Sequence, residues 1–390
     1  MKIALFSGNY NYQADGANKA LNRLVGYMEA QGHEMLVFSP TAKRPAFEPT
    51  GTLISVPSLP IPFRPEYRLA RGLTPALKAR IRDFAPDFFH LSAPDRLGHS
   101  ALNFAETLGI PAVASFHTRF DTYLDYYKLG FLSSYARRLM AKFYARCAHV
   151  YVPSPSMANV LQDEGLIGDN LRFWGRGITR EKFDPALRDM EWRRRIGIAD
   201  DEIALAFVGR LVKEKGLDIY VALIKAALEA GLPVKPIVIG DGPERGWVEK
   251  NLPASIPTDL LLGHVSGAEL ARAYASADIF INPSRTETFG NVTLEAMASG
   301  LPALCLSATG SIDLIKDGHT GYIIEGTPIE NWLEKIRQLC NQADQRKAMG
   351  LAAWQASQAY DWSAIFSELE AHYKEVLSIA KARRETALSA

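Results

Sequence analysis

Residues 283–302 of this chain read PSRTETFGNVTLEAMASGLP, and the apolar run Ile279–Ile281 just before them is typical of a buried strand. Within the stretch, apolar residues at helical spacing predict a helix over Val292–Ser299, which Gly300 would end. A strand, a polar loop and a helix therefore follow one another here. This succession is the repeating unit of a parallel β-sheet covered by helices.

The same unit recurs along the chain, which predicts an α/β protein with two Rossmann-like, doubly wound parallel sheets. The expected strands are Lys2–Phe6, Glu34–Ser39, Asp87–Leu91, Pro111–Phe116, His149–Pro153, Ile203–Val208, Val234–Ile239, Asp259–Leu262, Ile279–Ile281 and Pro302–Cys305. The expected helices are Asn18–Gln31, Pro75–Phe84, Ser133–Cys147, Leu217–Ala230, Ser266–Ala275, Val292–Ser299, Ile329–Ala343 and Trp362–Leu377. A length of 390 residues also predicts two domains, with a boundary in the segment Phe183–Asp200.

The composition excludes several classes of protein. With 47% hydrophobic and 22% charged residues, the chain is neither disordered nor fibrous. Its cysteines, Cys147, Cys305 and Cys340, are far apart, which argues against a disulfide framework or a Cys-rich metal site. No apolar run is long enough to span a membrane, and the first residues read as a strand and not as a signal peptide. We therefore expect a cytoplasmic protein.

The net charge of +1 conceals an uneven distribution. Residues 1–185 carry 22 basic against 16 acidic side chains, whereas the remainder carries 22 against 27. This asymmetry indicates different partners for the two halves, although a chance distribution of surface charge is the alternative.

Ligands of open α/β sheets bind at the carboxyl ends of the strands, so polar residues that follow strands are candidates for a site. The strongest set lies in residues 283–302, where N–H groups at a helix start favour an anion. The carboxylates of Glu287 and Glu295 flank them and can accept hydrogen bonds from sugar and ribose hydroxyls. The alternative is that Glu287 is solvated and Glu295 complements the helix dipole. The residues expected to offer N–H groups are Phe289, Gly290, Asn291 and Val292.

A second set follows the strand Ile203–Val208. Gly209 ends that strand without bulk, and Arg210 and Lys215 would lie beside the start of the next helix, where they suit a diphosphate. Two solvated basic residues are the alternative. Gly240 follows the next strand and permits close approach of a ligand, although a purely structural turn explains it as well.

In the first half, His117 follows the strand Pro111–Phe116 and is expected to face a cleft between the domains. Gly16 lies where the loop after the first strand enters a helix, so a ligand could approach its backbone. That loop lacks the G-x-G-x-x-G pattern, which argues against a dehydrogenase.

Together these motifs resemble the retaining GT-B glycosyltransferases of glycosyltransferase family 4. Glu287 and Glu295 match the E-x7-E signature of that family. The stretch from Thr286 to Glu295 and the element His117-Thr118-x-Phe120 are similar to the subgroup of sulfoquinovosyl-diacylglycerol synthases and lipid mannosyltransferases. The resemblance covers nearly the whole chain.

The resemblance implies a role for each candidate. Residues 1–185, together with a carboxyl-terminal helix at about 362–390, would form the acceptor domain, and residues 186–361 the donor domain. Arg210 and Lys215 would bind the donor diphosphate, Glu287 the sugar and Glu295 the ribose. The residues expected at the donor are Gly16, Gly209, Arg210, Lys215, Gly240, Glu287, Phe289, Gly290, Asn291, Val292 and Glu295, and those expected to act in catalysis are His117, Arg210, Lys215 and Glu287.

The expected reaction moves a hexose-type sugar from a nucleotide diphosphate sugar to a lipid or membrane-associated acceptor. A UDP-sugar is the first candidate for the donor and GDP-mannose the second. The nucleotide sugar is a co-substrate, and neither a cofactor nor a metal is expected because Arg210 and Lys215 supply the positive charge.

Basic and apolar residues in the first half suit an anionic membrane surface, which would place the protein on the inner face of the plasma membrane. A solvated basic face is the alternative, and a pI of about 7.7 gives no support to nucleic-acid binding. One group is Phe63, Arg64, Tyr67, Arg68, Leu69, Arg71, Lys78, Arg80 and Arg82; the other is Phe131, Leu132, Tyr135, Arg137, Arg138, Leu139, Lys142 and Arg146. The oligomeric state has no signal in the sequence.

Three other functions are open at this point. A glycosyltransferase with a soluble or polysaccharide acceptor has the same donor motifs. A GT-B nucleotide-sugar epimerase needs acid and base groups but no second acceptor. A non-catalytic nucleotide-sugar binder is disfavoured because all the charged candidates are present.

Overall fold

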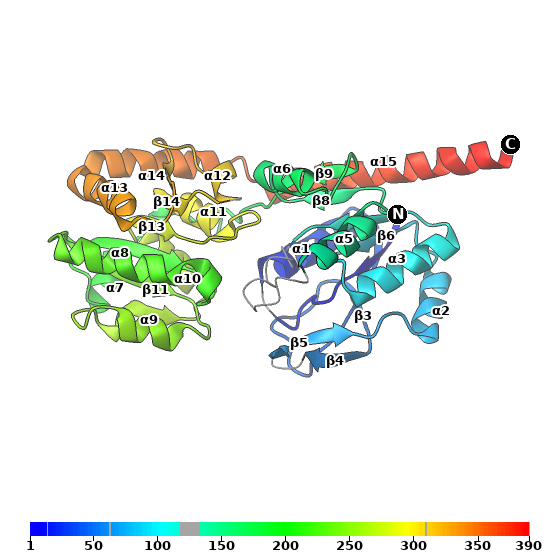
Figure 1. The fold of residues 1–390 in the computed structure, drawn as a ribbon, viewed down its shortest axis with the longest axis horizontal. Coiled ribbons are helices and arrows are strands. Elements are labelled where there is room, and N and C mark those ends of the chain that lie inside the picture. Colours follow the sequence, from blue (N-terminus) through cyan, green and yellow to red (C-terminus); the bar gives the residue numbers. More distant parts are fainter. Residues whose placement is uncertain (14, 62–63, 118–132, 309, 390) are drawn as a thin grey trace. The chain divides into compact units, whose positions relative to one another are not determined.

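The computed structural model of the chain describes residues 1–13, 15–61, 64–117, 133–308 and 310–389 (Figure 1). It divides into two compact units, Met1–Gly175 with Ser363–Ala390, and Arg176–Trp362. This division differs from the expected one, because residues 176–185 belong to the second unit. Ile178 pairs with Asp361, and Phe183 packs on Tyr274 with ring centroids 5.8 Å apart.

The first unit contains a parallel sheet with strand order β3-β2-β1-β6-β7-β8-β9. The aromatic ring of Phe6 stacks on Phe38 and on Phe89, each with centroids 5.0 Å apart, so neighbouring strands are joined through their side chains. The strands are β1 (Lys2–Phe6), β2 (Glu34–Ser39), β3 (Thr52–Ser55), β6 (Phe88–Leu91), β7 (Ala112–Ser115), β8 (Val150–Val152) and β9 (Leu171–Phe173). The edge strands β3 and β9 were not predicted because they are short and only partly buried.

Helices cover this sheet, and one antiparallel hairpin lies apart from it. The hairpin consists of β4 (Ser58–Ile61) and β5 (Arg64–Ala70). The helices are α1 (Gly16–Ala30), α2 (Pro75–Phe84), α3 (Arg96–Leu108), α5 (Ser133–Tyr144), α6 (Pro155–Asp163) and the greater part of α15 (Trp362–Ser389).

The last helix, α15, packs on the first unit (Figure 1). Phe366 lies against Tyr27 of α1 with centroids 5.4 Å apart, and Tyr373 lies against Phe88 of β6 at 4.7 Å. The Tyr373 hydroxyl is also hydrogen-bonded to Nδ1 of the buried His90, 2.6 Å away. The helix continues to Ser389, beyond the end at Leu377 that the apolar pattern predicts and within the range of about 362–390 that the resemblance implies.

The second unit contains a parallel sheet with strand order β12-β11-β10-β13-β14-β15. The strands are β10 (Ile203–Val208), β11 (Val234–Ile239), β12 (Leu261–Gly263), β13 (Ile279–Asn282), β14 (Ala303–Leu306) and β15 (Gly321–Ile324). The expected strand at Asp259–Leu262 was wrong at its start, because Thr258–Leu260 form a 3-10 turn and the Leu260 N–H donates to the Pro257 carbonyl. The edge strand β15 was not predicted.

The helices of the second unit alternate with its strands, as the sequence pattern predicts. They are α7 (Met190–Arg195), α8 (Leu217–Glu229), α9 (Arg245–Asn251), α10 (Gly267–Ala275), α11 (Asn291–Ala298), α12 (Ser311–Leu314), α13 (Ile329–Asn341) and α14 (Ala343–Ser357). A single 3-10 turn, Lys213–Lys215, precedes α8. Over the described ranges, no helix is both long enough and apolar enough to cross a membrane.

Candidate active site

The order of the strands in the second unit defines a switch point between β10 and β13. The chain begins in the middle of the sheet at β10, proceeds outward to β11 and β12, and returns to β13 on the other side of β10. Ligands of open α/β sheets bind outside the carboxyl ends of the strands at such a point. The loop 209–216 after β10 and the loop 283–290 after β13 both begin there.

Two glycines bring the backbone of neighbouring loops into contact at this edge. Gly240 has a φ of +131°, and a Cβ on it would lie 1.9 Å from the Gly209 carbonyl oxygen. Its N–H donates to the Gly263 carbonyl at 2.7 Å. The close approach requires a glycine at 240, so this residue has a structural function whether or not a ligand contacts it.

The two loops at the switch point also pack directly on one another. Gly216 has a φ of +71°, and a Cβ there would lie 2.1 Å from the Pro283 carbonyl oxygen. The Arg285 N–H donates to the Glu214 carbonyl at 3.2 Å. The loops therefore form one continuous surface.

The side chains of Lys215 and Glu287 meet on this surface. Lys215 Nζ donates to Glu287 Oε1 at 2.6 Å, and the side chains are 28% and 10% exposed. Arg210 is exposed in the same loop as Lys215, two residues after β10 ends. The structure thus pairs the cation expected at the diphosphate with the carboxylate expected at the sugar.

Helix α11 begins beside Glu287. Gly290, with a φ of +95°, precedes its first residue Asn291, and the first N–H groups of a helix have no carbonyl one turn earlier to accept them. Asn291 and Val292 lie in that first turn, and Phe289 is buried against the ring of Tyr360, with centroids 6.0 Å apart. The helix start can therefore bind an anion through backbone groups.

Glu295 lies one turn into α11, and its carboxylate contacts a buried tyrosine. The hydroxyl of Tyr274, from α10, donates to Glu295 Oε2 at 3.1 Å and to the Val292 carbonyl at 3.2 Å. The Tyr274 side chain is fully buried. Burial, then the charge of Glu295, raises the pKa of Tyr274 well above its usual range, so its hydroxyl stays protonated and donates.

The two candidates in the first unit lie at the carboxyl edge of its own sheet. His117 follows β7 by two residues, and its ring contacts Trp174 edge-on with centroids 5.2 Å apart. Gly16 is the exposed first residue of α1, which the Asp15 side chain caps by accepting from the Asn18 N–H at 2.8 Å. Thr118 and Phe120 of the histidine motif lie outside the described residues.

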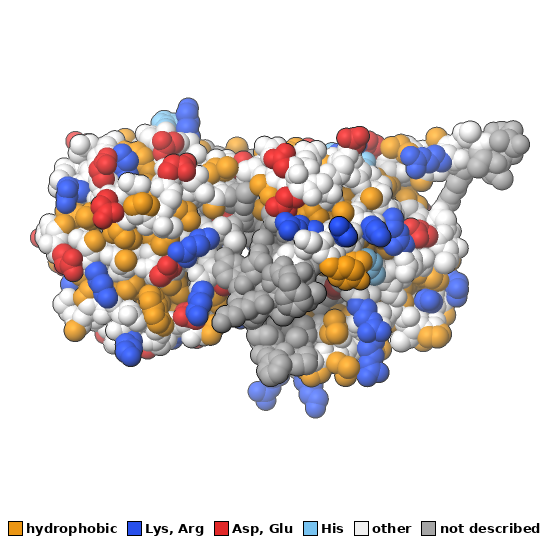
Figure 2. All heavy atoms as spheres, viewed as in Figure 1, with side chains coloured by type: hydrophobic (Ala, Val, Ile, Leu, Met, Phe, Trp, Pro, Cys, Tyr) orange, Lys and Arg blue, Asp and Glu red, His pale blue; other side chains and the backbone are white. Residues whose placement is uncertain are grey.

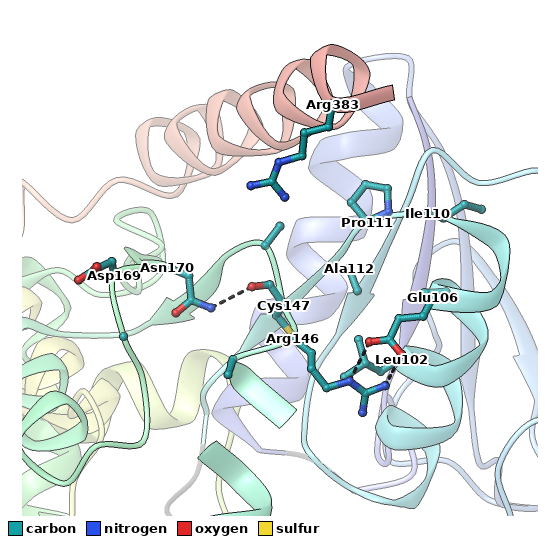
Figure 3. A pocket seen from close by; sticks show the side chains of 14 residues that line it. Leu102, Glu106, Ile110, Pro111, Ala112, Arg146, Cys147, Asp169, Asn170 and Arg383 are labelled. Atoms are coloured by element: carbon teal, nitrogen blue, oxygen red, sulfur yellow. Dashed lines mark hydrogen bonds and ion pairs between the residues drawn. The ribbon is translucent and has the colours of Figure 1, made fainter. Parts of the chain in front are cut away.

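A separate cavity of about 570 Å³ lies at the opposite, amino-terminal edge of the first sheet (Figure 3). Arg383 from α15 points toward it, whereas the guanidinium of Arg146 is bound by Glu106 and Asn103 at 2.6–2.8 Å. Burial raises the pKa of the Cys147 thiol beside it to about 12, which makes that thiol unreactive. This cavity therefore shows none of the chemistry found at the switch point.

No group of three or more His, Cys, Asp or Glu side chains in the described part of the chain is arranged to hold a metal ion. The expectation that the reaction needs no metal or other cofactor stays a prediction.

Sequence reasoning missed three residues that contact the charged candidates or lie beside them in the chain: Tyr274, Arg285 and Asp218. Arg285 Nη1 and Nη2 donate to the two carboxylate oxygens of Asp218 at 3.0 and 2.8 Å. Asp218, acidic in the first turn of α8, carries a weak signal. Tyr274 carries none, since its contact with Glu295 exists only when α10 and α11 pack together.

Comparison with known proteins identifies the family of the chain. A model described as Glycosyltransferase Family 4 matches residues 14–182, and one described as Glycosyl transferases group 1 matches residues 189–355. The chain is 31% identical to the sulfoquinovosyl transferase SQD2 of Arabidopsis thaliana, over 94% of this chain and 72% of that protein. It is 28% identical to a GDP-mannose-dependent alpha-mannosyltransferase of Corynebacterium glutamicum, over 98% and 90% of the two chains.

Among solved structures, the sucrose-phosphate synthase of Thermosynechococcus elongatus superposes with a TM-score of 0.80 at 19% identity, covering 97% of this chain and 99% of that one. The two parallel sheets with their flanking helices define the GT-B fold, and the matched models and relatives define a glycosyltransferase. The chain belongs to the family 4 glycosyltransferases, which confirms the resemblance seen in residues 286–295.

Proposed function

We propose that this protein is a retaining hexosyltransferase that uses a nucleotide diphosphate sugar and a lipid or membrane-associated acceptor. The observation that carries the donor half of this proposal is the contact between Lys215 Nζ and Glu287 Oε1, 2.6 Å long, at the switch point and beside the start of α11. It combines a cation for the diphosphate, a carboxylate for the sugar hydroxyls and backbone N–H groups for a phosphate.

The chemistry follows from where charge develops. When the anomeric C–O bond to the diphosphate breaks, negative charge grows on the leaving group and positive charge on the sugar. Arg210, Lys215 and the start of α11 stabilise the leaving group, and removal of one such contact typically costs on the order of 10²–10³ in rate. The acceptor hydroxyl forms the new C–O bond on the same face, and its proton passes to the departing phosphate, so the configuration is retained.

The names of the relatives bear on the donor to different degrees. The Corynebacterium glutamicum protein is by its name GDP-mannose-dependent, which favours GDP-mannose. SQD2 is by its name a sulfoquinovosyl transferase, and that name specifies the transferred sugar and not the nucleotide. We keep the UDP-sugar first and GDP-mannose second.

The acceptor is proposed from the exposed face of α5. Tyr135, Arg138, Leu139 and Lys142 recur at helical spacing, and Tyr135 and Leu139 are 63% and 40% exposed. On the β4–β5 hairpin, Leu59 and Leu69 are 50% and 47% exposed. Figure 2 shows basic and apolar side chains together on this face of the first unit.

An apolar helix face edged by basic residues suits the surface of an anionic membrane and would bring the enzyme to a lipid acceptor. Phe63, Phe131 and Leu132, expected in the same groups, lie outside the described residues.

The test is release of nucleoside diphosphate from UDP-glucose and GDP-mannose by the purified full chain. Each donor is offered alone, with vesicles of diacylglycerol in phosphatidylglycerol, and with soluble sugars. We expect release from one donor that rises with the vesicles, and a glycolipid whose new bond keeps the donor's anomeric configuration by NMR. If soluble sugars alone stimulate release, the proposal of a lipid acceptor is wrong. Conversion of the donor to an epimer would indicate an epimerase. Inversion of the anomeric configuration in the product would contradict a retaining mechanism.

A further inference from the structure

We propose that the buried hydroxyl of Tyr274 is a positioning group that orients Glu295 and thereby makes nucleotide affinity depend on the ribose hydroxyls. This inference rests on the proposed function, in which Glu295 contacts the ribose of the donor.

The position of Tyr274 is fixed by packing from two sides. Its ring lies edge-on to Phe183 with centroids 5.8 Å apart, and tilted against Phe280 of β13 with centroids 6.0 Å apart. The side chain has no exposed surface. The hydroxyl therefore reaches α11 from a buried ring that is packed on two sides.

The hydroxyl carries one proton and has two acceptors within reach. These are Glu295 Oε2 at 3.1 Å and the Val292 carbonyl oxygen at 3.2 Å. A hydrogen bond to an ionised acceptor is stronger than one to a neutral carbonyl, so the carboxylate is the preferred partner. With Oε2 held in this way, rotation of the Glu295 carboxylate is restricted.

This restriction has a consequence for binding. A carboxylate that is oriented before the ligand arrives loses less conformational freedom on binding, and one ordered side chain is worth about 0.5–1.5 kcal/mol of affinity, or roughly two- to twelvefold in Kd. The gain applies only to ligands that use the carboxylate. A nucleotide without ribose hydroxyls should not benefit from the Tyr274 hydroxyl.

The experiment compares UDP and GDP with their 2′,3′-dideoxy analogues by calorimetry on the full chain. For the nucleotide that the wild type binds, Tyr274→Phe should weaken the ribose form about three- to tenfold and leave the dideoxy form unchanged. The control is Tyr220→Phe, which removes an equally buried hydroxyl, one that donates to the Leu205 carbonyl at 2.7 Å in the core. That variant should bind both forms as the wild type does.

Two further results separate this inference from the proposed function. If the wild type binds the ribose and dideoxy forms equally, the assignment of Glu295 fails and the inference falls with it. If the wild type prefers the ribose form and Glu295→Gln removes the preference, the assignment stands. An unchanged preference in Tyr274→Phe, or equal loss for both forms, would then overturn the role of Tyr274 alone.

Discussion

Arg285 and Asp218 form a bidentate ion pair that joins the loop after β13 to the first turn of α8. The distances from the guanidinium to the two carboxylate oxygens are 3.0 and 2.8 Å. Arg285 precedes Glu287 by two residues, and Asp218 follows Lys215 by three. Burial would raise the pKa of Asp218, but hydrogen bonding to Arg285 is the larger effect and holds it below its ordinary value.

The pair is expected to serve activity more than stability. The side chains are 34% and 57% exposed, and such pairs contribute about 0–1 kcal/mol to unfolding. Arg285→Gln or Asp218→Asn should therefore leave the melting temperature nearly unchanged but lower kcat/KM, because the pair joins the two segments that carry Lys215 and Glu287 and we expect its loss to displace them. The double variant should lose no more than either single one. Additive losses would contradict a joint action of the two residues.

A second prediction concerns the stability of the second unit. Arg193, fully buried on α7, donates to Asp278 Oδ2 at 2.7 Å and to the carbonyls of Ser276 and Glu202 at 2.8 and 2.7 Å. Arg188 donates to the other oxygen of Asp278 at 2.7 Å. Arg193→Met leaves the largely buried Asp278 with Arg188 as its cationic partner and removes the donor of two carbonyls, so it should destabilise the unit by about 3–5 kcal/mol.

The measurement is urea unfolding followed by tryptophan fluorescence, because five of the six tryptophans, including the buried Trp192, belong to the second unit. Arg193→Met combined with Asp278→Asn should cost less than the sum of the single variants. Burial alone would raise the pKa of Asp278, but the charges of Arg188 and Arg193 outweigh it and lower that pKa below its ordinary value. The ionised Asp278 carboxylate therefore stabilises the folded chain at neutral pH, and this stabilisation is lost as the pH falls through the folded-state pKa of Asp278.

A third prediction concerns pH and the first unit. His90 is fully buried between Ser115 and Tyr373, and burial lowers its pKa from 6.5 to about 3. Below about pH 6.5 the unfolded chain binds a proton at His90 that the folded chain does not. Because of this residue, the free energy of unfolding falls by about 1.4 kcal/mol for each unit by which the pH is lowered.

The slope of stability between pH 6 and pH 4 should therefore flatten in His90→Gln. The exposed His319 provides the control, because His319→Gln should keep the slope of the wild type. A slope in His90→Gln equal to that of the wild type would show that His90 titrates normally.

A fourth prediction concerns membrane binding. Each basic residue near an anionic surface contributes about 1 kcal/mol, so Arg138→Gln with Lys142→Gln should weaken binding to phosphatidylglycerol vesicles about thirtyfold. Tyr135→Ser with Leu139→Ser should weaken binding at every salt concentration. The matched control removes two exposed lysines of the second unit, Lys225→Gln with Lys250→Gln, and should bind as the wild type does. Equal losses in the control would refute a specific membrane face on α5.

The central strands of both sheets could be predicted from the sequence because buried parallel strands are continuous apolar runs. Lys2–Phe6, Ile203–Val208 and Val234–Ile239 have the expected bounds for that reason. Edge strands such as β3 and β15 could not, because they are short or only partly covered and depend on a neighbouring strand for their hydrogen bonds. The apolar pattern alone placed the end of α15 too early, because the polar residues near it are compatible with helix as well as with coil.

The residues of the candidate site also divide into those that the sequence predicts and those that it does not. Lys215, Glu287 and the start of α11 could be placed because each follows a strand and belongs to a recognisable loop. Tyr274 and Arg285 could not, because their function depends on which side chain from another element meets them. The relation of Arg285 to Asp218, 67 residues apart in the chain, has no local signature.

The most direct test of the central claim, a nucleotide-sugar site at the switch point of the second unit, is the shift in melting temperature caused by UDP, GDP and their sugar conjugates. The wild type and Lys213→Ala should show the same shift with one nucleotide family, because Lys213 is exposed in the same 3-10 turn, whereas Lys215→Ala should show a much smaller one. A shift of full size in Lys215→Ala, or none in the wild type with any of these ligands, would contradict the account.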